Sequence, residues 1–250
     1  HPSATIGEDA EVGPFSVVEE GVTVGRGCKL YPRSHICAGT ILAENVEVHM
    51  NAVVGHLPQD LTFDPSVNSG VKVGKGTVIR EGATVHRATK EGSDTVLGEN
   101  IYLMSNAHVA HDCIIGNNTV IANGALIAGH CEVGERVFIS GNSPVHQFVR
   151  IGRLAMIGGL SRVNSDCPPF MLLELDSTIR RPNIIGLRRS GMDSDAIDAV
   201  KRAYHILYRQ GLQFTDAYER IEQDVDHPCA REIVEFCRNT KRGISKHYKP

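Results

Sequence analysis

A six-residue period of aliphatic residues is the feature of this sequence that most constrains its fold. Ile, Val or Leu stands at every sixth position over residues 6–54, and after a break the period resumes over residues 73–85 and 97–163. A small residue (Ala, Ser, Thr, Cys or Val) stands two positions before each aliphatic residue, with Ile101 the one larger exception, and Gly follows directly ten times. Chance does not produce such a run, so the period indicates a repeat architecture.

Each hexapeptide is interpreted as one short strand followed by one corner of a coil. The aliphatic residue points inward, the small residue packs where the turn is tight, and the glycine supplies backbone freedom at the corner. Three hexapeptides make an 18-residue turn, and successive turns stack as parallel strands about 4.8 Å apart. The sequence therefore predicts a mainly β protein whose residues 1–167 form a parallel β-helix of the hexapeptide type.

Two segments interrupt the period within the predicted β-helix. Residues 56–70 form a loop rich in Pro, Asp, Asn and Ser, and residues 89–94 form a shorter excursion. Loops that interrupt a regular scaffold often carry function, although a tolerated insertion would also explain either segment.

The chain beyond the repeat has a different pattern. Residues 168–191 are interpreted as an Arg-rich connector, and residues 192–250 as a small C-terminal α-helical domain. Apolar residues at helical spacing predict three helices. Asp193 or Ser194 is expected to cap the first, Thr215 to cap the second, and Pro228 to stand in the first turn of the third.

Composition and charge exclude several classes of protein. Lys and Arg total 26 against 29 Asp and Glu, a net charge of −3, which argues against a nucleic-acid or membrane-surface binder. No run of 18 apolar residues predicts an integral membrane segment, and no signal peptide is visible. The seven cysteines include no CxxC pair, so we expect a cytoplasmic protein with reduced thiols.

Charge is divided unevenly along the chain. Residues 168–250 carry a net charge of +2, and residues 1–167 a net charge of −5. This division predicts that the C-terminal part docks an acidic partner through residues such as Arg188 and Arg238. Ordinary solvated helices would explain the same charges.

Several histidines are expected to converge on one strip of the coil. Residues 18 apart stack on adjacent turns, so His111 is predicted to stack on Gly129 and then on Gln147. His130 and His146 flank that column, and His108 lies three residues before His111; His86 is the other histidine of the β-helix beyond the first loop break. Imidazoles so arranged suit either metal binding or general-base catalysis, and spacing alone does not separate the two.

Short motifs around these histidines, and others along the chain, narrow the choice. They are Asn106-Ala107-His108-Val109-Ala110-His111-Asp112-Cys113, Gly129-His130, Val145-His146-Gln147-Phe148, Pro58-Gln59-Asp60-Leu61, Val85-His86-Arg87, Asp166-Cys167-Pro168-Pro169 and Gly186-Leu187-Arg188-Arg189. In these motifs the sequence closely resembles one family of the hexapeptide-repeat acyltransferase superfamily, the bacterial UDP-N-acetylglucosamine O-acyltransferases that begin lipid A synthesis. The similarity covers nearly the whole chain.

This resemblance implies a left-handed β-helix, a homotrimer, and direct transfer of a (3R)-hydroxyacyl chain from acyl carrier protein to the 3-hydroxyl of UDP-N-acetylglucosamine, without a metal or bound cofactor. It implies His111 as general base, Asp112 as its orienting carboxylate and Gly129 as oxyanion donor. It also implies a group of substrate-binding residues: Gln59, Asp60, His86, His108, His130, His146, Gln147, Gly159, Asn183 and Arg189. Gly159 would set the length of the acyl chain, deeper along the same groove.

The sequence departs from better-known members of the family at residues that contact the UDP-sugar. Thr62 stands where Lys is frequent, Ile185 where Glu is frequent and Ser190 where Arg is frequent. Arg180 and Arg181 are candidates for replacement phosphate contacts. Two alternatives therefore accompany the main hypothesis: N-acyl transfer to a 3-amino UDP-sugar, and a hexapeptide-repeat metal enzyme similar to carbonic anhydrase.

Overall fold

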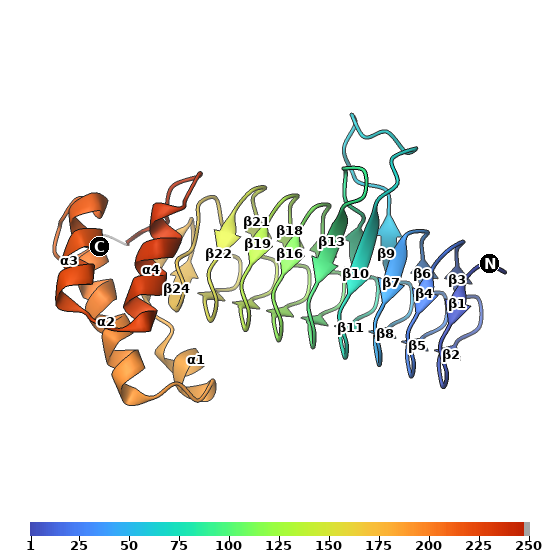
Figure 1. Cartoon of the computed structure of the whole chain (residues 1–250), viewed down its shortest axis with the longest axis horizontal. Coiled ribbons are helices and arrows are strands. Elements are labelled where there is room, and N and C mark those ends of the chain that lie inside the picture. The colour runs from blue at the N-terminus through green and yellow to red at the C-terminus, as the bar shows by residue number, and fades with distance from the viewer. Residues whose placement is uncertain (248–250) are drawn as a thin grey trace.

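The structure is a computed structural model that describes residues 1–247. Three flat walls of parallel strands form a long β-helix, and helices cover its C-terminal end (Figure 1). We call the walls A, B and C in the order in which the chain passes through them. The predicted left-handed parallel β-helix followed by helices is confirmed.

The strands of walls A and C are short and all pair in parallel. Wall A contains β1 (Thr5–Ile6), β4 (Thr23–Val24), β7 (Thr40–Leu42), β10 (Gly70–Val73), β13 (Asp94–Leu97), β16 (Ile114–Ile115), β19 (Glu132–Val133) and β22 (Arg150–Ile151). Wall C contains β3 (Val17–Val18), β6 (His35–Ile36), β9 (Val53–His56), β12 (Thr84–His86), β15 (His108–Val109), β18 (Leu126–Ile127) and β21 (Pro144–Val145).

Wall B is the longest wall because the C-terminal region adds strands to it. It contains β2 (Glu11–Val12), β5 (Lys29–Leu30), β8 (Glu47–Val48), β11 (Val78–Ile79), β14 (Tyr102–Leu103), β17 (Val120–Ile121), β20 (Phe138–Ile139), β23 (Met156–Ile157), β24 (Met171–Glu174), β25 (Thr178–Pro182) and β26 (Lys246–His247). Among the strands of residues 1–247, only the β24–β25 pair is antiparallel.

The pairing register confirms the 18-residue turn. Val109 pairs with Ile127, and Ile127 pairs with Val145. Where an excursion intervenes, the turn lengthens, so that Val85 pairs with Val109, 24 residues on. Residues 56–70 and 89–94 project together from one side of the β-helix, beside β9, β10 and β13 (Figure 1).

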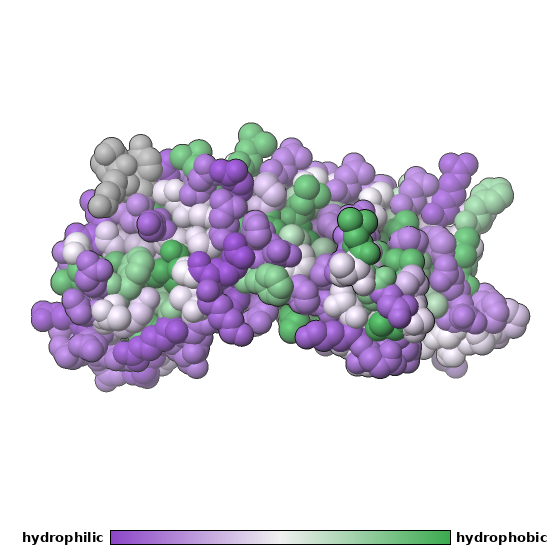
Figure 2. All heavy atoms as spheres, turned by 90° about the horizontal axis from the view of Figure 1, so that it is seen from above, coloured by the Kyte–Doolittle hydropathy of each residue, from purple (hydrophilic) through white to green (hydrophobic). Residues whose placement is uncertain are grey.

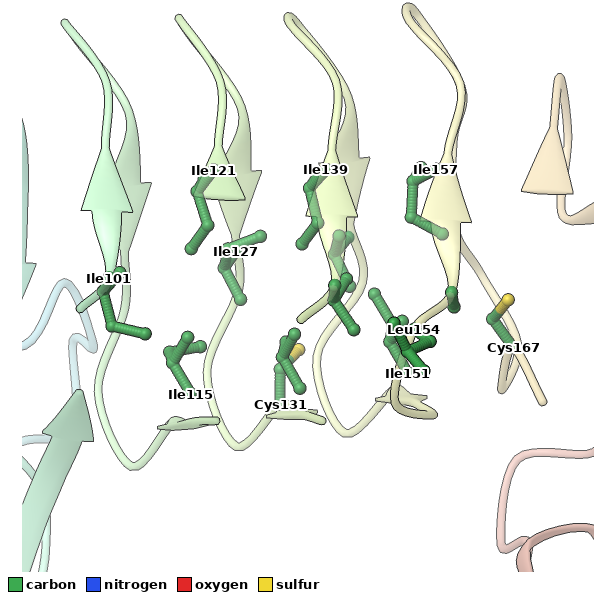
Figure 3. Close-up of a cluster of buried hydrophobic side chains, with 14 of the residues drawn as sticks. Ile101, Ile115, Ile121, Ile127, Cys131, Ile139, Ile151, Leu154, Ile157 and Cys167 are labelled. Carbon is green, nitrogen blue, oxygen red and sulfur yellow. The ribbon is translucent and has the colours of Figure 1, made fainter. Parts of the chain in front are cut away.

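The aliphatic residues of the period form the core. From Val24 to Val163 each of them is buried, and Ile121, Ile139 and Ile157 stack one above another along the axis (Figure 3). Burying such a side chain contributes roughly 1.5–3 kcal/mol. Ile6 and Val12 are 46% and 49% exposed, because no turn covers the first one.

Backbone freedom does not explain most of the glycines that follow the aliphatic residues, so that interpretation was wrong. Gly116 and Gly134 have no positive φ, but a Cβ on either would lie 2.5 Å from backbone of the next turn. Close approach between turns is what requires them. The left-handed conformation falls three residues before the aliphatic residue instead, at Asn106, Asp112 and His130 among others.

Four helices follow the repeat. They are α1 (Ile184–Arg189), α2 (Ser194–Arg209), α3 (Phe214–Asp224) and α4 (Pro228–Arg238). Asp193 caps α2 and Pro228 opens α4, as predicted. The prediction that Thr215 caps the second helix was wrong, because Gln213 is the N-cap of α3 and its side chain makes no capping bond. The predicted connector 168–191 contains β24, β25 and α1. The sequence did not predict them, because these elements are short and follow no period.

Two further observations concern the cysteines and the helices. All seven cysteines are buried free thiols. None of the helices in the described part of the chain is long and apolar enough to span a bilayer.

Candidate active site

His111 and Gly129 are in van der Waals contact, as the 18-residue register predicted. His111 lies at the corner between walls C and A that follows β15. A Cβ on Gly129 would lie 2.5 Å from His111 Cε1 and 2.7 Å from His111 Nε2, so only glycine leaves this ring in place. Gly129 therefore keeps Nε2 accessible.

Asp112 fixes the orientation of the His111 ring. Its Oδ2 lies 2.7 Å from His111 Nδ1, which leaves Nε2 as the free nitrogen. The Thr89 hydroxyl and amide donate to the two oxygens of Asp112 at 2.8 and 3.1 Å. Burial opposes ionisation of Asp112, but the hydrogen bonds from His111 and Thr89 outweigh it and lower the pKa of the carboxyl. Asp112 is thus an anchored carboxylate.

His130 lies on the other side of Asp112. Its Nε2 is 3.7 Å from Asp112 Oδ2, and its ring meets the His111 ring edge-on with centroids 5.1 Å apart. The Phe148 ring stacks on it at 4.5 Å. Burial lowers the pKa of His130; the charge of Asp112 opposes this shift, and the charge of His111 adds to it.

His86 and His108 form a second, more buried pair. Their ring centroids are 4.8 Å apart, and Thr84 Oγ1 lies 2.7 Å from His108 Nδ1. Burial, and then the charges of neighbouring imidazoles, lower the pKa of His86 to about 4. Burial also lowers the pKa of His108, followed by the charge of His111. Both rings are therefore neutral near pH 7.

His108, His111 and Gly129 open onto a cleft of about 640 Å³, the histidine cleft, whereas His86, Asp112 and His130 are not among the residues that line it. It is lined by Gln59, Thr84, Asn106, His108, Ala110, His111, Leu126, Ala128, Gly129, Pro144, Val145 and Gln147. Asp60 stands in the neighbouring loop and accepts hydrogen bonds from the Thr62 amide and hydroxyl, which lower its pKa. His146 is not among the residues that line the cleft.

The remaining predicted residues line a different cleft. A cavity of about 470 Å³, the α1 cleft, contains Gly159, Arg181, Asn183, Ile185 and Arg189 among its lining residues. Within one chain, Gly159 thus lies at the edge of wall C opposite to His111, rather than deeper in the same groove. Asn183 is the N-cap of α1 and donates to Leu154 O at 3.0 Å, so its side chain also has a structural task.

Arg188 and Arg238, the two residues predicted to contact an acidic partner, differ in whether they form an ion pair. Arg238 pairs with Glu222 through two contacts of 2.6 and 2.9 Å, whereas Arg188 is exposed in the last turn of α1. Arg188 is consequently the better candidate for contact with an acidic partner.

Sequence reasoning missed the threonines that hold the site. Thr84 could have been found, because the register across the 24-residue turn aligns it with His108. Thr89 could not, because it lies in an excursion that has no period. The sequence also did not predict that Asp112 and His130 adopt a left-handed backbone conformation, with φ of +58° and +61°.

The cluster could serve either of the two chemistries left open. One ligand atom each from His111, Asp112 and His130 lies within 4.8 Å of the others, a spacing that a metal ion could bridge. The same atoms form a carboxylate–imidazole pair suited to a general base. Comparison with known proteins separates these possibilities.

The sequence profile described as "Udp N-acetylglucosamine O-acyltransferase; Domain 2" matches residues 166–245, and the bacterial hexapeptide transferase profile matches residues 3–36 and 94–129. An acyl–acyl-carrier-protein–UDP-N-acetylglucosamine O-acyltransferase of Thermodesulfovibrio yellowstonii is 36% identical over 98% of this chain and 96% of its own length. The chain belongs to this family. The homologous enzyme of Chlorobaculum parvum is 40% identical over 99% of this chain and 94% of its own.

Solved structures of the family have the same fold along the whole chain. The UDP-N-acetylglucosamine acyltransferase of Francisella novicida superposes with a TM-score of 0.95 at 31% identity, covering 98% of this chain and 91% of its own. The enzyme of Campylobacter jejuni gives 0.93 at 33% identity, covering 99% and 97%. This protein is therefore an acyltransferase, and the carbonic anhydrase-like alternative loses its support.

Proposed function

We propose that the protein transfers a (3R)-hydroxyacyl chain from acyl carrier protein to the 3-hydroxyl of UDP-N-acetylglucosamine, the first step of lipid A biosynthesis. The observation that carries this proposal is the intact His111–Asp112–Gly129 arrangement at a cleft, in a chain of this family. Family membership alone would also describe a relative that had lost its catalytic groups.

The geometry assigns each group a step. His111 Nε2 takes the proton of the sugar hydroxyl as its oxygen attacks the thioester carbonyl carbon. Asp112 holds Nδ1–H and stabilises the imidazolium. When the C–S bond breaks, the imidazolium returns the proton to the departing sulfur. The oxygen of the sugar then carries the acyl group, and the carrier thiol is released.

In this proposal the Gly129 amide donates a hydrogen bond to the oxyanion of the tetrahedral intermediate. Within residues 1–247 no group accepts a hydrogen bond from its amide, which lies beside the His111 ring. The His111 and Gln147 amides, one turn below and above, are also without acceptors, but only Gly129 lacks a side chain that would crowd the reacting carbon. A preorganised amide in a partly dry cleft is well suited to the developing negative charge.

Binding of the UDP-sugar is assigned partly to the α1 cleft. Arg181 and Arg189 are exposed there and can approach a diphosphate, whereas Arg180 is held by Glu174 at 3.1 Å. Ser190 donates to Leu187 O, and Ile185 presents an aliphatic side chain that is 60% exposed. Ser190 and Ile185 thus offer the UDP-sugar no charged group, and this is why we keep the 3-amino UDP-sugar as the alternative acceptor.

The separation of the two clefts supports a homotrimer as the working assembly. One chain places the proposed chemistry on wall C and the proposed nucleotide contacts beside wall B, so neighbouring chains would have to join them. Apolar residues also reach the surface of the β-helix on the face seen in Figure 2. Over the whole surface, the large exposed apolar side chains include Ile114, Leu126, Phe148 and Leu160, at 53%, 48%, 50% and 78% exposure. Light scattering should give a mass of three 27.2 kDa chains.

Product analysis tests the function. The purified protein would receive (3R)-hydroxyacyl carrier thioesters of several lengths with either UDP-N-acetylglucosamine or its 3-amino analogue, and mass spectrometry would identify the product. We expect an O-acylated UDP-sugar from the first acceptor, formed at least about 10²-fold more slowly by the His111→Ala variant. Product from the amine alone would replace the proposed acceptor, and no product from either would overturn the proposal. Extensive chelation beforehand should leave the rate unchanged.

A further inference from the structure

A second cluster of metal-ligating side chains lies three turns from His111, at the same corner of the coil. Glu19 and Cys37 occupy equivalent positions on the first and second turns, each directly after the inward aliphatic residue of wall C. His35 lies two residues before Cys37, on the same face of the chain. One ligand atom from each of the three residues lies within 4.8 Å of the other two.

The thiol of Cys37 differs from the other cysteines of the β-helix. Cys28, Cys113 and Cys131 stand at the small inward position, and each thiol donates to a backbone carbonyl 2.9–3.1 Å away. Cys37 instead follows the aliphatic residue and is 5% exposed, and within residues 1–247 its sulfur has no hydrogen-bond partner. This buried thiol lies next to a carboxylate and an imidazole, and the three groups together supply the ligand types that a zinc-like ion binds.

Glu19 and His35 are hydrogen-bonded in place and partly exposed to solvent. Glu19 Oε1 lies 2.7 Å from His35 Nε2, while Glu19 Oε2 accepts from the Ala38 amide at 2.9 Å. The side chains of Glu19 and His35 are 39% and 36% exposed, which gives an entry path.

We propose that Glu19, His35 and Cys37 bind a zinc-type divalent transition-metal cation, with water as the fourth ligand. Thiolate and imidazole ligands select zinc or cobalt over calcium and magnesium. In a tetrahedral site with bonds of about 2.0–2.3 Å, ligand atoms lie roughly 3.3–3.8 Å apart, so a shift of about 1 Å closes the site. The thiol proton is released to solvent as the sulfur–metal bond forms, and the cation replaces the proton between Glu19 and His35.

Charge is compatible with a bound cation. Glu19 is ionised near neutral pH, because its pKa is lowered. The hydrogen bond from the Ala38 amide lowers the pKa most, burial opposes this shift, and His35 adds to it. Together with the thiolate it balances a divalent ion. His56 and Arg87 are the other charged or titratable groups that act on the cluster. The cation would tie the first turn, whose aliphatic residues are partly exposed, to the buried second turn.

Cobalt titration of the full-length, reduced and metal-free protein tests the site. We expect a thiolate-to-cobalt charge-transfer band in the near ultraviolet that saturates at one equivalent of Co²⁺. The histidine cleft contains no sulfur ligand, so cobalt bound there cannot produce the band. Cys37→Ser should abolish it, and the matched control Cys28→Ser, which removes another buried thiol of the same turn, should retain it.

A second variant guards against misfolding of Cys37→Ser. His35→Gln changes a partly exposed side chain, and it should keep the wild-type circular dichroism while weakening cobalt binding by about tenfold or more. Absence of the band in the wild-type protein would overturn the proposal. So would a band of undiminished strength in Cys37→Ser, or unchanged affinity in His35→Gln.

Discussion

The histidine cleft and the α1 cleft differ in how their polar side chains are held. In the histidine cleft, Asp112 and Thr89 fix His111, and Thr84 fixes His108, so each ring has one orientation. In the α1 cleft, Arg181 and Arg189 are exposed and form no ion pair within the described residues. Fixed groups suit a step that depends on orientation, whereas mobile cations suit the capture of an anion. Changes in the first cleft should therefore lower kcat, and changes in the second should raise KM.

The largest effect is expected for His111→Ala. Loss of a positioned base should lower kcat by roughly 10²–10⁴-fold, with little change in KM for the acceptor. The fold should survive, because the ring lies at a corner outside the aliphatic core. Steady-state rates with circular dichroism measure both properties, and near wild-type turnover in a folded variant would assign the base to another histidine.

Gly129→Ala should have nearly as large an effect without removing a catalytic side chain. The new methyl would lie 2.5 Å from His111 Cε1, so the ring must move. A displacement of about 1 Å at a reacting group can cost on the order of 10²-fold in rate. Gly159→Ala is the matched control for thermal stability, since its Cβ would meet nothing closer than 3.9 Å. Equal kcat in the Gly129→Ala and wild-type proteins would show that this contact does not position the base.

His86 should make the protein sensitive to acid. Its folded-state pKa of about 4 lies below the ordinary value of about 6.5, so the unfolded chain binds the proton more readily. Stability should therefore fall as the pH drops from about 6.5 to 4, by up to about 3 kcal/mol from this group. Denaturant unfolding across that range should show a shallower loss for His86→Gln. Parallel curves for the two proteins would mean that His86 does not contribute.

Thr89→Val should have a moderate effect on the same cleft. The change keeps the shape of the side chain but removes the hydroxyl that donates to Asp112 Oδ2. One such hydrogen bond contributes about 0.5–1.5 kcal/mol, so kcat should fall by about 3–10-fold. Thr178→Val, which removes an exposed hydroxyl bonded to Asp176 O, is the control. If both variants turned over equally, the excursion at 89–94 would have no part in holding Asp112.

The smallest effect is expected in the α1 cleft. Arg181→Ala should raise KM for the UDP-sugar by about 10-fold or less, with kcat nearly unchanged, because an exposed cation contributes binding in the ground and transition states alike. Arg238→Ala serves as control, since that guanidinium is already paired with Glu222. A fall in kcat without a change in KM would remove the distinction between the two clefts.

The period predicted the β-helix and the meeting of His111 with Gly129, because one register shift of 18 residues relates all the turns. It could not predict what lies outside the period. Thr89 reaches Asp112 from an excursion, α1 is only six residues long, and β24 and β25 pair antiparallel after the repeat has ended. The period does place Gly159 and His111 at different corners of the coil, because Gly159 is not a multiple of 18 residues from His111 and follows a wall B strand instead of a wall C strand.

Single-turnover transfer at saturating concentrations of both substrates tests the central claim most directly, because product release cannot then hide the chemical step. The comparison needs three proteins: wild type, His111→Ala and Arg181→Ala. If the histidine cleft performs the chemistry, the rate constant of His111→Ala should fall by at least about 10²-fold while that of Arg181→Ala stays at the wild-type value. A wild-type rate constant in folded His111→Ala would contradict the claim that this imidazole is the base.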